Sequence, residues 1–127
     1  MIESTITAKG QTITFVTVHA SLHEEERPGN AKAILTALGA RASRAIIVGD
    51  FNEKPSQDIG DALTGAGFVD GFHEKHALFG YTEPANFPTR RIDFIYRARA
   101  FGKTEHAWVP DTQASDHRPV GAVIPLR

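Results

Sequence analysis

Apolar and β-branched residues are concentrated in two short segments at the start of the chain. Ile, Val and Thr dominate residues 2–8 and 12–18, and Lys9, Gly10 and Gln11 lie between them. β-branched residues on both sides of a glycine, which adopts positive φ without strain, are typical of a β-hairpin. His19 follows the second segment, so we expect it at the end of a strand.

Two later segments have apolar residues at helical spacing. The first runs from Pro28, which suits the first turn of a helix, to Gly39, which suits its end. The second follows Ser56, a common N-terminal capping residue, and ends at Gly67. The apolar positions are Ala31, Ile34, Leu35 and Leu38 in the first segment, and Ile59, Ala62, Leu63 and Ala66 in the second.

The remaining strands are predicted from short apolar runs. Residues 45–49 form a continuous run typical of a buried strand, and residues 92–96 form another. We expect two more strands at 104–109 and 119–124, and a loop or short strand at 68–76. Alternating strand and helix segments along 127 residues indicate one mixed α and β domain.

The composition limits the partners that this chain can have. A net charge of −1 and a pI near 6.6 provide no general attraction for polyphosphate, so tight nucleic-acid binding is not expected. The sequence has no cysteine, which excludes thiolate catalysis and cysteine-ligated zinc. No apolar run approaches the length of a membrane span, and the first residues do not resemble a signal peptide. We therefore expect a cytoplasmic protein with no membrane partner.

Polar side chains follow the buried strand at residues 45–49. Asp50 and Asn52 lie on either side of Phe51, so the acid and the amide can face one cleft while the ring packs inward. Such a carboxylate can orient or deprotonate water, and the amide can donate a hydrogen bond to a phosphate oxygen. The alternative is an Asx turn at the end of the strand, a common structural use of Asp and Asn.

Asp93 lies within an apolar strand segment, where a buried carboxylate without a partner would cost several kcal/mol. One candidate partner is His117, because a carboxylate can orient a catalytic imidazole. The other is a salt bridge to Arg90 or Arg91. Arg91 is also a candidate clamp for a substrate phosphate.

The tripeptide Ser115-Asp116-His117 places an acid next to an imidazole, before the last predicted strand. Alone it is also typical of a capped turn, and a histidine such as His19 after a Val-rich strand is commonly structural. Together, however, the polar groups at the strand ends supply acids, an amide and imidazoles. These groups can hold a metal and activate water against a phosphate, so we predict one dispersed active site.

The order of these groups resembles the endonuclease/exonuclease/phosphatase superfamily. Val18-His19 comes first, then Gly49-Asp50-Phe51-Asn52, then Arg91-Ile92-Asp93-Phe94-Ile95, and last Ser115-Asp116-His117-Arg118-Pro119-Val120. Residues 82–93 are most similar to the bacterial metal-dependent hydrolases of that superfamily. The resemblance implies an α+β fold for residues 1–127, taken as a single partial domain. This fold would be half of a four-layer α/β sandwich, with a mixed, mainly antiparallel sheet and helices on its outer face.

The resemblance also implies a magnesium-dependent phosphoesterase, with Mn²⁺ as the alternative ion and a phosphodiester or phosphomonoester as substrate. Asp50 would activate the attacking water and Asn52 would stabilise the phosphate. His117, oriented by Asp93, would contact the phosphate or relay a proton. His19 would assist at the phosphate or at the leaving oxygen.

The metal site is where the sequence departs from the family. Asp116 would help to hold the ion, but the family's principal metal ligand, a Glu, belongs to an N-terminal half that we expect to be absent here. Fewer carboxylate ligands weaken metal binding, and the sheet would lack the cover of that half. This cover would come from a homodimer, a complementing N-terminal half or a longer parent protein. The alternative function is a catalytically inactive half-domain that serves as an interaction or assembly module.

Overall fold

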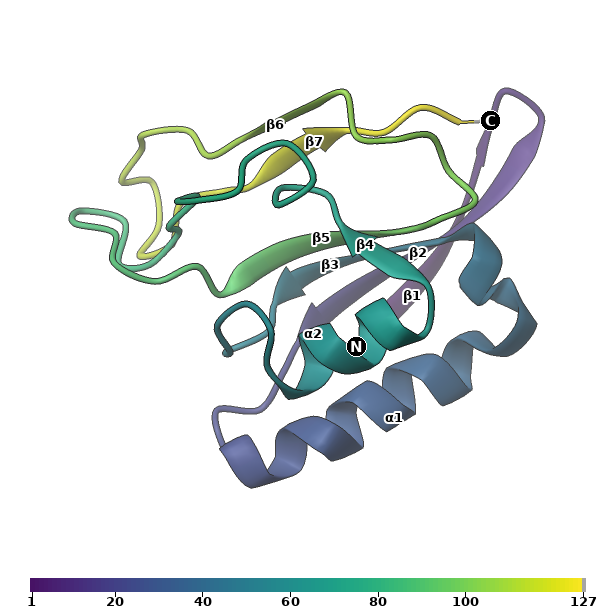
Figure 1. Cartoon of the computed structure of the whole chain (residues 1–127), viewed down its shortest axis with the longest axis horizontal. Coiled ribbons are helices and arrows are strands. Elements are labelled where there is room, and N and C mark those ends of the chain that lie inside the picture. The colour runs from purple at the N-terminus through teal and green to yellow at the C-terminus, as the bar shows by residue number, and fades with distance from the viewer. Residues whose placement is uncertain (127) are drawn as a thin grey trace.

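The computed structural model describes residues 1–126 and consists of three layers (Figure 1). The middle layer is a five-stranded sheet with the strand order β1-β2-β3-β5-β4. Helices cover one face of this sheet, and a two-stranded sheet lies over the other. The strands of the large sheet are β1 (Ile2–Ala8), β2 (Gln11–His19), β3 (Ala45–Asp50), β4 (Phe68–Asp70) and β5 (Asp93–Ala98).

The helical layer is formed by η1 (Glu24–Glu26), α1 (Arg27–Leu38), η2 (Gly39–Arg44) and α2 (Asp58–Gly65). The small sheet pairs β6 (His106–Trp108) with β7 (Gly121–Val123). In the large sheet β2 and β3 are parallel and connected through α1, whereas the other neighbouring strands are antiparallel. The predicted α+β class, with a mainly antiparallel sheet and helices on its outer face, is therefore confirmed.

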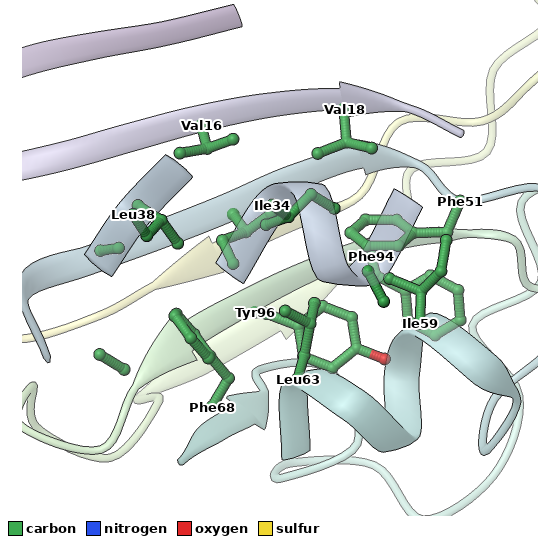
Figure 2. Close-up of a cluster of buried hydrophobic side chains, with 14 of the residues drawn as sticks. Val16, Val18, Ile34, Leu38, Phe51, Ile59, Leu63, Phe68, Phe94 and Tyr96 are labelled. Atoms are coloured by element: carbon green, nitrogen blue, oxygen red, sulfur yellow. The ribbon is translucent and has the colours of Figure 1, made fainter. Parts of the chain in front are cut away.

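The core lies between the large sheet and the helices (Figure 2). It is built from strand residues that face the helices and from the apolar sides of α1 and α2, including Val16, Val18, Ile34, Leu38, Phe51, Ile59, Leu63, Phe68, Phe94 and Tyr96. The rings of Phe51 and Phe94 pack edge to face with centroids 5.5 Å apart. Burying such a side chain contributes roughly 1.5–3 kcal/mol, so this core firmly holds β3 beside β5.

Strand alternation directs several polar groups to the face opposite the helices. On β3, Ala45 and Ile47 are fully buried on the helix side, so Asp50 does not project toward the helices. Asp50 is paired with His19 of β2 and with Asp93 of β5, and paired residues project from the same face of a sheet. The register thus gathers three candidate residues at one end of the sheet.

The N-terminus of α2 differs from the prediction. Ser56 does not cap the helix, and the buried Glu53 carboxylate instead accepts the N–H groups of Ile59 (3.1 Å) and Gly60 (2.7 Å). A charged acceptor at this end of a helix satisfies free N–H groups and interacts favourably with the helix dipole. Burial raises the pKa of Glu53, and these two hydrogen bonds oppose the increase.

Three elements are shorter than predicted. The helix α2 ends at Gly65 rather than at Gly67, which has a φ of 91° that does not belong to a helix. β6 covers only part of 104–109, because the N–H of Thr104 donates to the Glu74 carboxylate at 2.8 Å. β7 covers only part of 119–124, which begins with a proline that has no N–H to donate.

The sheet face opposite the helices is only partly covered. A groove of about 840 Å³ remains between the large sheet and the segment around β7, and its apolar lining includes Phe15, Ile46, Val48, Ile95 and Ile124. At the edge of the sheet, β1 adds Ile2 (70% exposed) and Ile6 (42% exposed). Contiguous apolar surface of this kind is uncommon on soluble monomers. No helix within residues 1–126 has the length and hydrophobicity needed to cross a bilayer.

Candidate active site

Three ionisable groups from separate parts of the chain meet at one end of the sheet. Asp50 ends β3, Asp93 begins β5, and His117 lies in the loop before β7. One ligand atom from each lies within 4.8 Å of the other two, and all three residues are partly buried. Asp93 and His117 also form part of the wall of the apolar groove.

Asp93 is paired with the imidazole of His117. Nδ1 of His117 donates to Oδ2 of Asp93 at 2.9 Å, because an ionised carboxylate can only accept. Arg90, one of the partners considered for Asp93, is paired with Glu83 instead. With Nδ1 held in this way, Nε2 is the ring nitrogen that this arrangement leaves for a substrate.

The pKa of His117 lies above its ordinary value. Partial burial of the ring lowers the pKa, but the hydrogen bond to Asp93 and the negative charges of Asp93 and Asp50 outweigh this. The imidazole is therefore charged over a wider pH range than a free histidine. A charged imidazole can contact a phosphate or give a proton to a leaving oxygen.

The two carboxylate oxygens of Asp50 have different surroundings. Oδ1 accepts the backbone N–H of Asn52 at 2.8 Å, and Oδ2 lies 3.7 Å from Nε2 of His19. Burial raises the pKa of Asp50, the Asn52 hydrogen bond opposes this, and the charge of Asp93 adds to the increase. A carboxylate with a raised pKa is a better base toward water.

Asn52 and His19 flank the Asp50 carboxylate. Asn52 has a φ of 51°, a conformation that Asn tolerates, and its Nδ2 donates to the carbonyl of Ala20 at 2.9 Å. This bond fixes the turn after β3 against the end of β2. The Asx turn from Asp50 to the Asn52 N–H is thus present as part of the site, not as an alternative to it. The His19 side chain is 77% exposed and lies at the open rim.

A neighbouring turn-rich segment holds the loop that carries His117. The N–H of Ala85 donates to the carbonyl of Asp116 at 2.7 Å, and the N–H of Arg118 donates to the carbonyl of Thr82 at 2.7 Å. Nε of Arg118 also donates to the carbonyl of Ala85 at 2.8 Å. These bonds on both sides of His117 fix the position of its imidazole.

Sequence patterns did not predict this contact between loops, nor the Glu53 cap of α2. A pairing between two irregular segments leaves no periodic pattern, and Glu is not among the preferred N-terminal capping residues. The available signal for the first contact was the turn-rich composition of residues 82–88, which marks a segment that needs neighbours to be ordered.

Arg91 and Asp116 do not join the three central groups. Arg91 is buried, lies 2.7 Å from the carboxylate of Asp70 and stacks over the Phe94 ring at 4.5 Å. The Asp116 side chain is exposed and accepts the hydroxyl of Ser115 at 3.0 Å, which lowers the pKa of Asp116. Their roles as phosphate clamp and metal ligand remain predictions that these contacts do not favour.

Asp50, Asp93 and His117 offer the donor atoms for a divalent cation. Magnesium is held in proteins through one or two carboxylates, with water and substrate oxygens in the other positions. Asp50 and Asp93 are paired across β3 and β5, and their mutual repulsion contributes to the raised pKa of Asp50. A cation between them would relieve this repulsion, so these residues fit the ion that the family resemblance implies.

The comparisons with known proteins agree with the fold. The model described as the endonuclease/exonuclease/phosphatase family matches residues 4–117. This match extends over most of the chain, so the chain belongs to the endonuclease/exonuclease/phosphatase family. No curated protein sequence matches the chain significantly.

Solved structures show the same fold. A family protein from Bacteroides thetaiotaomicron is 23% identical with a TM-score of 0.77, covering 91% of this chain and 51% of that one. A mannosyl-6-phosphatase from the same organism is 24% identical with a TM-score of 0.75, covering 91% and 52%. A humanized TDP2 from D. rerio is 21% identical with a TM-score of 0.71, covering 96% and 59%. The chain thus spans about half the length of the first two structures.

Proposed function

We propose that this chain carries part of the catalytic centre of a magnesium-dependent phosphoesterase, which hydrolyses a phosphodiester or phosphomonoester with activated water. The observation that supports this most strongly is the meeting of Asp50, Asp93 and His117 within 4.8 Å at the ends of the strands. An acid with a raised pKa, beside an imidazole oriented by a second acid, can move protons to and from water and a leaving oxygen.

Each residue has a distinct task in this proposal. Asp50 takes the proton of the attacking water, while His117, oriented by Asp93, contacts the phosphate or gives a proton to the leaving oxygen. Asn52 holds the turn beside Asp50 through Ala20 and has a second amide hydrogen for the phosphate. His19, at the rim, assists at the phosphate or at the leaving oxygen.

Asp50 and Asp93 would hold the divalent cation, with Mg²⁺ proposed and Mn²⁺ as the alternative. When bound, the ion supplies positive charge that stabilises the phosphate oxygens as the bond to phosphorus breaks. Two carboxylates are a small ligand set, so this chain alone would hold the ion weakly.

A second polypeptide would complete the site, as a second copy of this chain or as a complementing N-terminal half. Two observations support this part of the proposal. The apolar groove borders Asp93 and His117, so whatever fills it also lies beside the catalytic groups. The chain also spans about half the length of the structures that share its fold.

The second candidate function is a catalytically inactive half-domain that serves as an interaction or assembly module. The small set of cation ligands and the apolar groove favour this candidate. It predicts that the polar residues keep the loops in place and that their removal changes stability alone.

Hydrolysis of a generic phosphodiester and a generic phosphomonoester, measured with and without Mg²⁺, tests the catalytic proposal. We expect activity that requires the ion and that falls by about 100-fold or more in Asp50→Asn and in His117→Ala, the range of general acid and base catalysis. Asp58→Asn is the matched control, because Asp58 lies in the first turn of α2 and outside the site. Activity that is unaffected by both substitutions would reject the catalytic assignment and support the interaction module.

A further inference from the structure

A second pocket lies beside the candidate active site, on the side of the loop before β5. It has two parts, whose linings share two cationic residues. The inner part, of about 180 Å³, is lined by Asn52 and Ile92, the neighbours of the catalytic acids. The outer part, of about 350 Å³, is lined by Phe79 and Tyr81. Lys54 and Arg90 line both parts.

The outer part presents two aromatic rings to solvent. Phe79 is 72% exposed and Tyr81 is 44% exposed, and their rings meet edge to face with centroids 6.3 Å apart. Exposed aromatic rings at a pocket are typical of surfaces that stack on a planar group.

The backbone holds Phe79 in this exposed position. Phe79 has a φ of 71°, a conformation that is strained for a bulky side chain. The next residue, Gly80, packs so closely on Phe72 that a Cβ there would lie 2.3 Å from the ring. Strained backbone that the surroundings maintain is found most often at functional sites. The exposed ring is therefore a maintained feature of this loop.

Both cationic and acidic side chains line this pocket, and Arg90 is paired with Glu83. Lys54 has no ion pair among the described residues, and it lies two positions after Asn52. Arg90 lies three positions before Asp93, which is at most about 10 Å of extended chain. A phosphate ester bound at Asp50 and His117 could thus extend its organic group over Lys54 toward Phe79.

We propose that Lys54, Phe79 and Tyr81 form an aromatic subsite, which selects phosphate esters whose organic group carries a planar aromatic ring. The ring stacks on Phe79 or Tyr81, and Lys54 attracts the anionic ester. Nucleotides and aryl phosphates share this chemistry. The inference rests on the proposed function, because the subsite is useful only if a phosphate ester occupies the neighbouring site.

Binding measured by calorimetry in the presence of Mg²⁺ tests the subsite without requiring turnover. Two matched pairs isolate the ring: adenosine monophosphate against ribose 5-phosphate, and phenyl phosphate against cyclohexyl phosphate. We expect the aromatic member to bind about tenfold more tightly, as for one stacked ring. A preference in the first pair alone would identify nucleotides as the ligands, and a preference in both would include aryl phosphates.

Phe79→Ala should remove most of this tenfold preference and leave the affinity for ribose 5-phosphate within about twofold. Phe87→Ala is the matched control, because Phe87 is an exposed phenylalanine (77%) of the same region that lines neither part of the pocket. Equal binding within both pairs, no measurable binding of any of the four esters, or equal losses in the two variants would overturn the proposal.

Failure of the subsite differs from failure of the proposed function. Asp50→Asn should abolish hydrolysis but keep the preference for aromatic esters. Hydrolysis without that preference would reject the subsite alone. The preference without any hydrolysis that depends on Asp50 would reject the catalytic assignment alone.

Discussion

Gly49 is the residue on which the position of Asp50 most depends. Its φ of 137° lies in the region that favours glycine, and a Cβ at this position would lie 1.9 Å from the carbonyl oxygen of Val18. Only hydrogen therefore fits between β3 and β2 directly before the proposed catalytic acid.

Gly49→Ala should lower the free energy of unfolding by roughly 3 kcal/mol or more, since backbone strain and a clash with backbone both contribute. Urea denaturation measures this loss. Gly29→Ala is the control, because a Cβ at Gly29, within α1, would meet nothing within 4 Å. That substitution should be neutral or stabilise the helix by up to about 1 kcal/mol. Equal effects of the two substitutions would contradict the proposed role of Gly49.

At the scale of elements, periodic patterns predicted the helices and strands that depend on residues near each other in sequence. The hairpin around Gly10, the helix that ends at Gly39 and the strand before Asp50 follow from β-branched runs, helical spacing and glycine positions, and all three are present. The predictions for α2, β6 and β7 were too long, and for β6 the reason is a side chain distant in sequence. The Glu74 carboxylate takes the N–H of Thr104.

In the site, too, local sequence patterns predicted some positions, whereas contacts between residues distant in sequence determine others. The sequence predicted Asp50 at the end of a strand, Asp93 within a strand and His117 in the connection before the last strand. The register of β3 with β5 brings the two acids together. The position of His117 depends on bonds between loops around Thr82 and Arg118, which no pattern in the sequence describes. The proposed aromatic subsite was not predicted for the same reason, since Lys54 and Phe79 line one pocket only in the folded chain.

At the scale of the whole molecule, one face of the sheet lacks a complete cover. The groove of about 840 Å³ is lined mainly by apolar residues and lies beside Asp93 and His117. Burying apolar surface contributes roughly 25 cal/mol per Å², so a polypeptide layer packed in this groove would be stabilised strongly. A partner bound in this groove would therefore lie directly beside the proposed catalytic groups.

The solution mass, measured over a range of concentrations with an apolar dye present, tests the need for a partner. The chain has a mass of 13.8 kDa, and we expect either a dimer or a monomer that binds the dye. A dimer would identify a second copy as the cover, and a monomer that binds the dye would indicate a separate half. A monomer that does not bind the dye would contradict the proposal.

The most direct test of the central claim is whether Asp50 and Asp93 hold one cation beside His117. Mn²⁺ added at roughly millimolar concentration, as expected for a weak site, should broaden the NMR signals of all three residues through its unpaired electrons. Asp50→Asn should greatly reduce this broadening, whereas Asp58→Asn should leave it unchanged. Broadening confined to the exposed Glu24–Glu26 segment, or the same broadening in both variants, would contradict the claim that these three residues form one site.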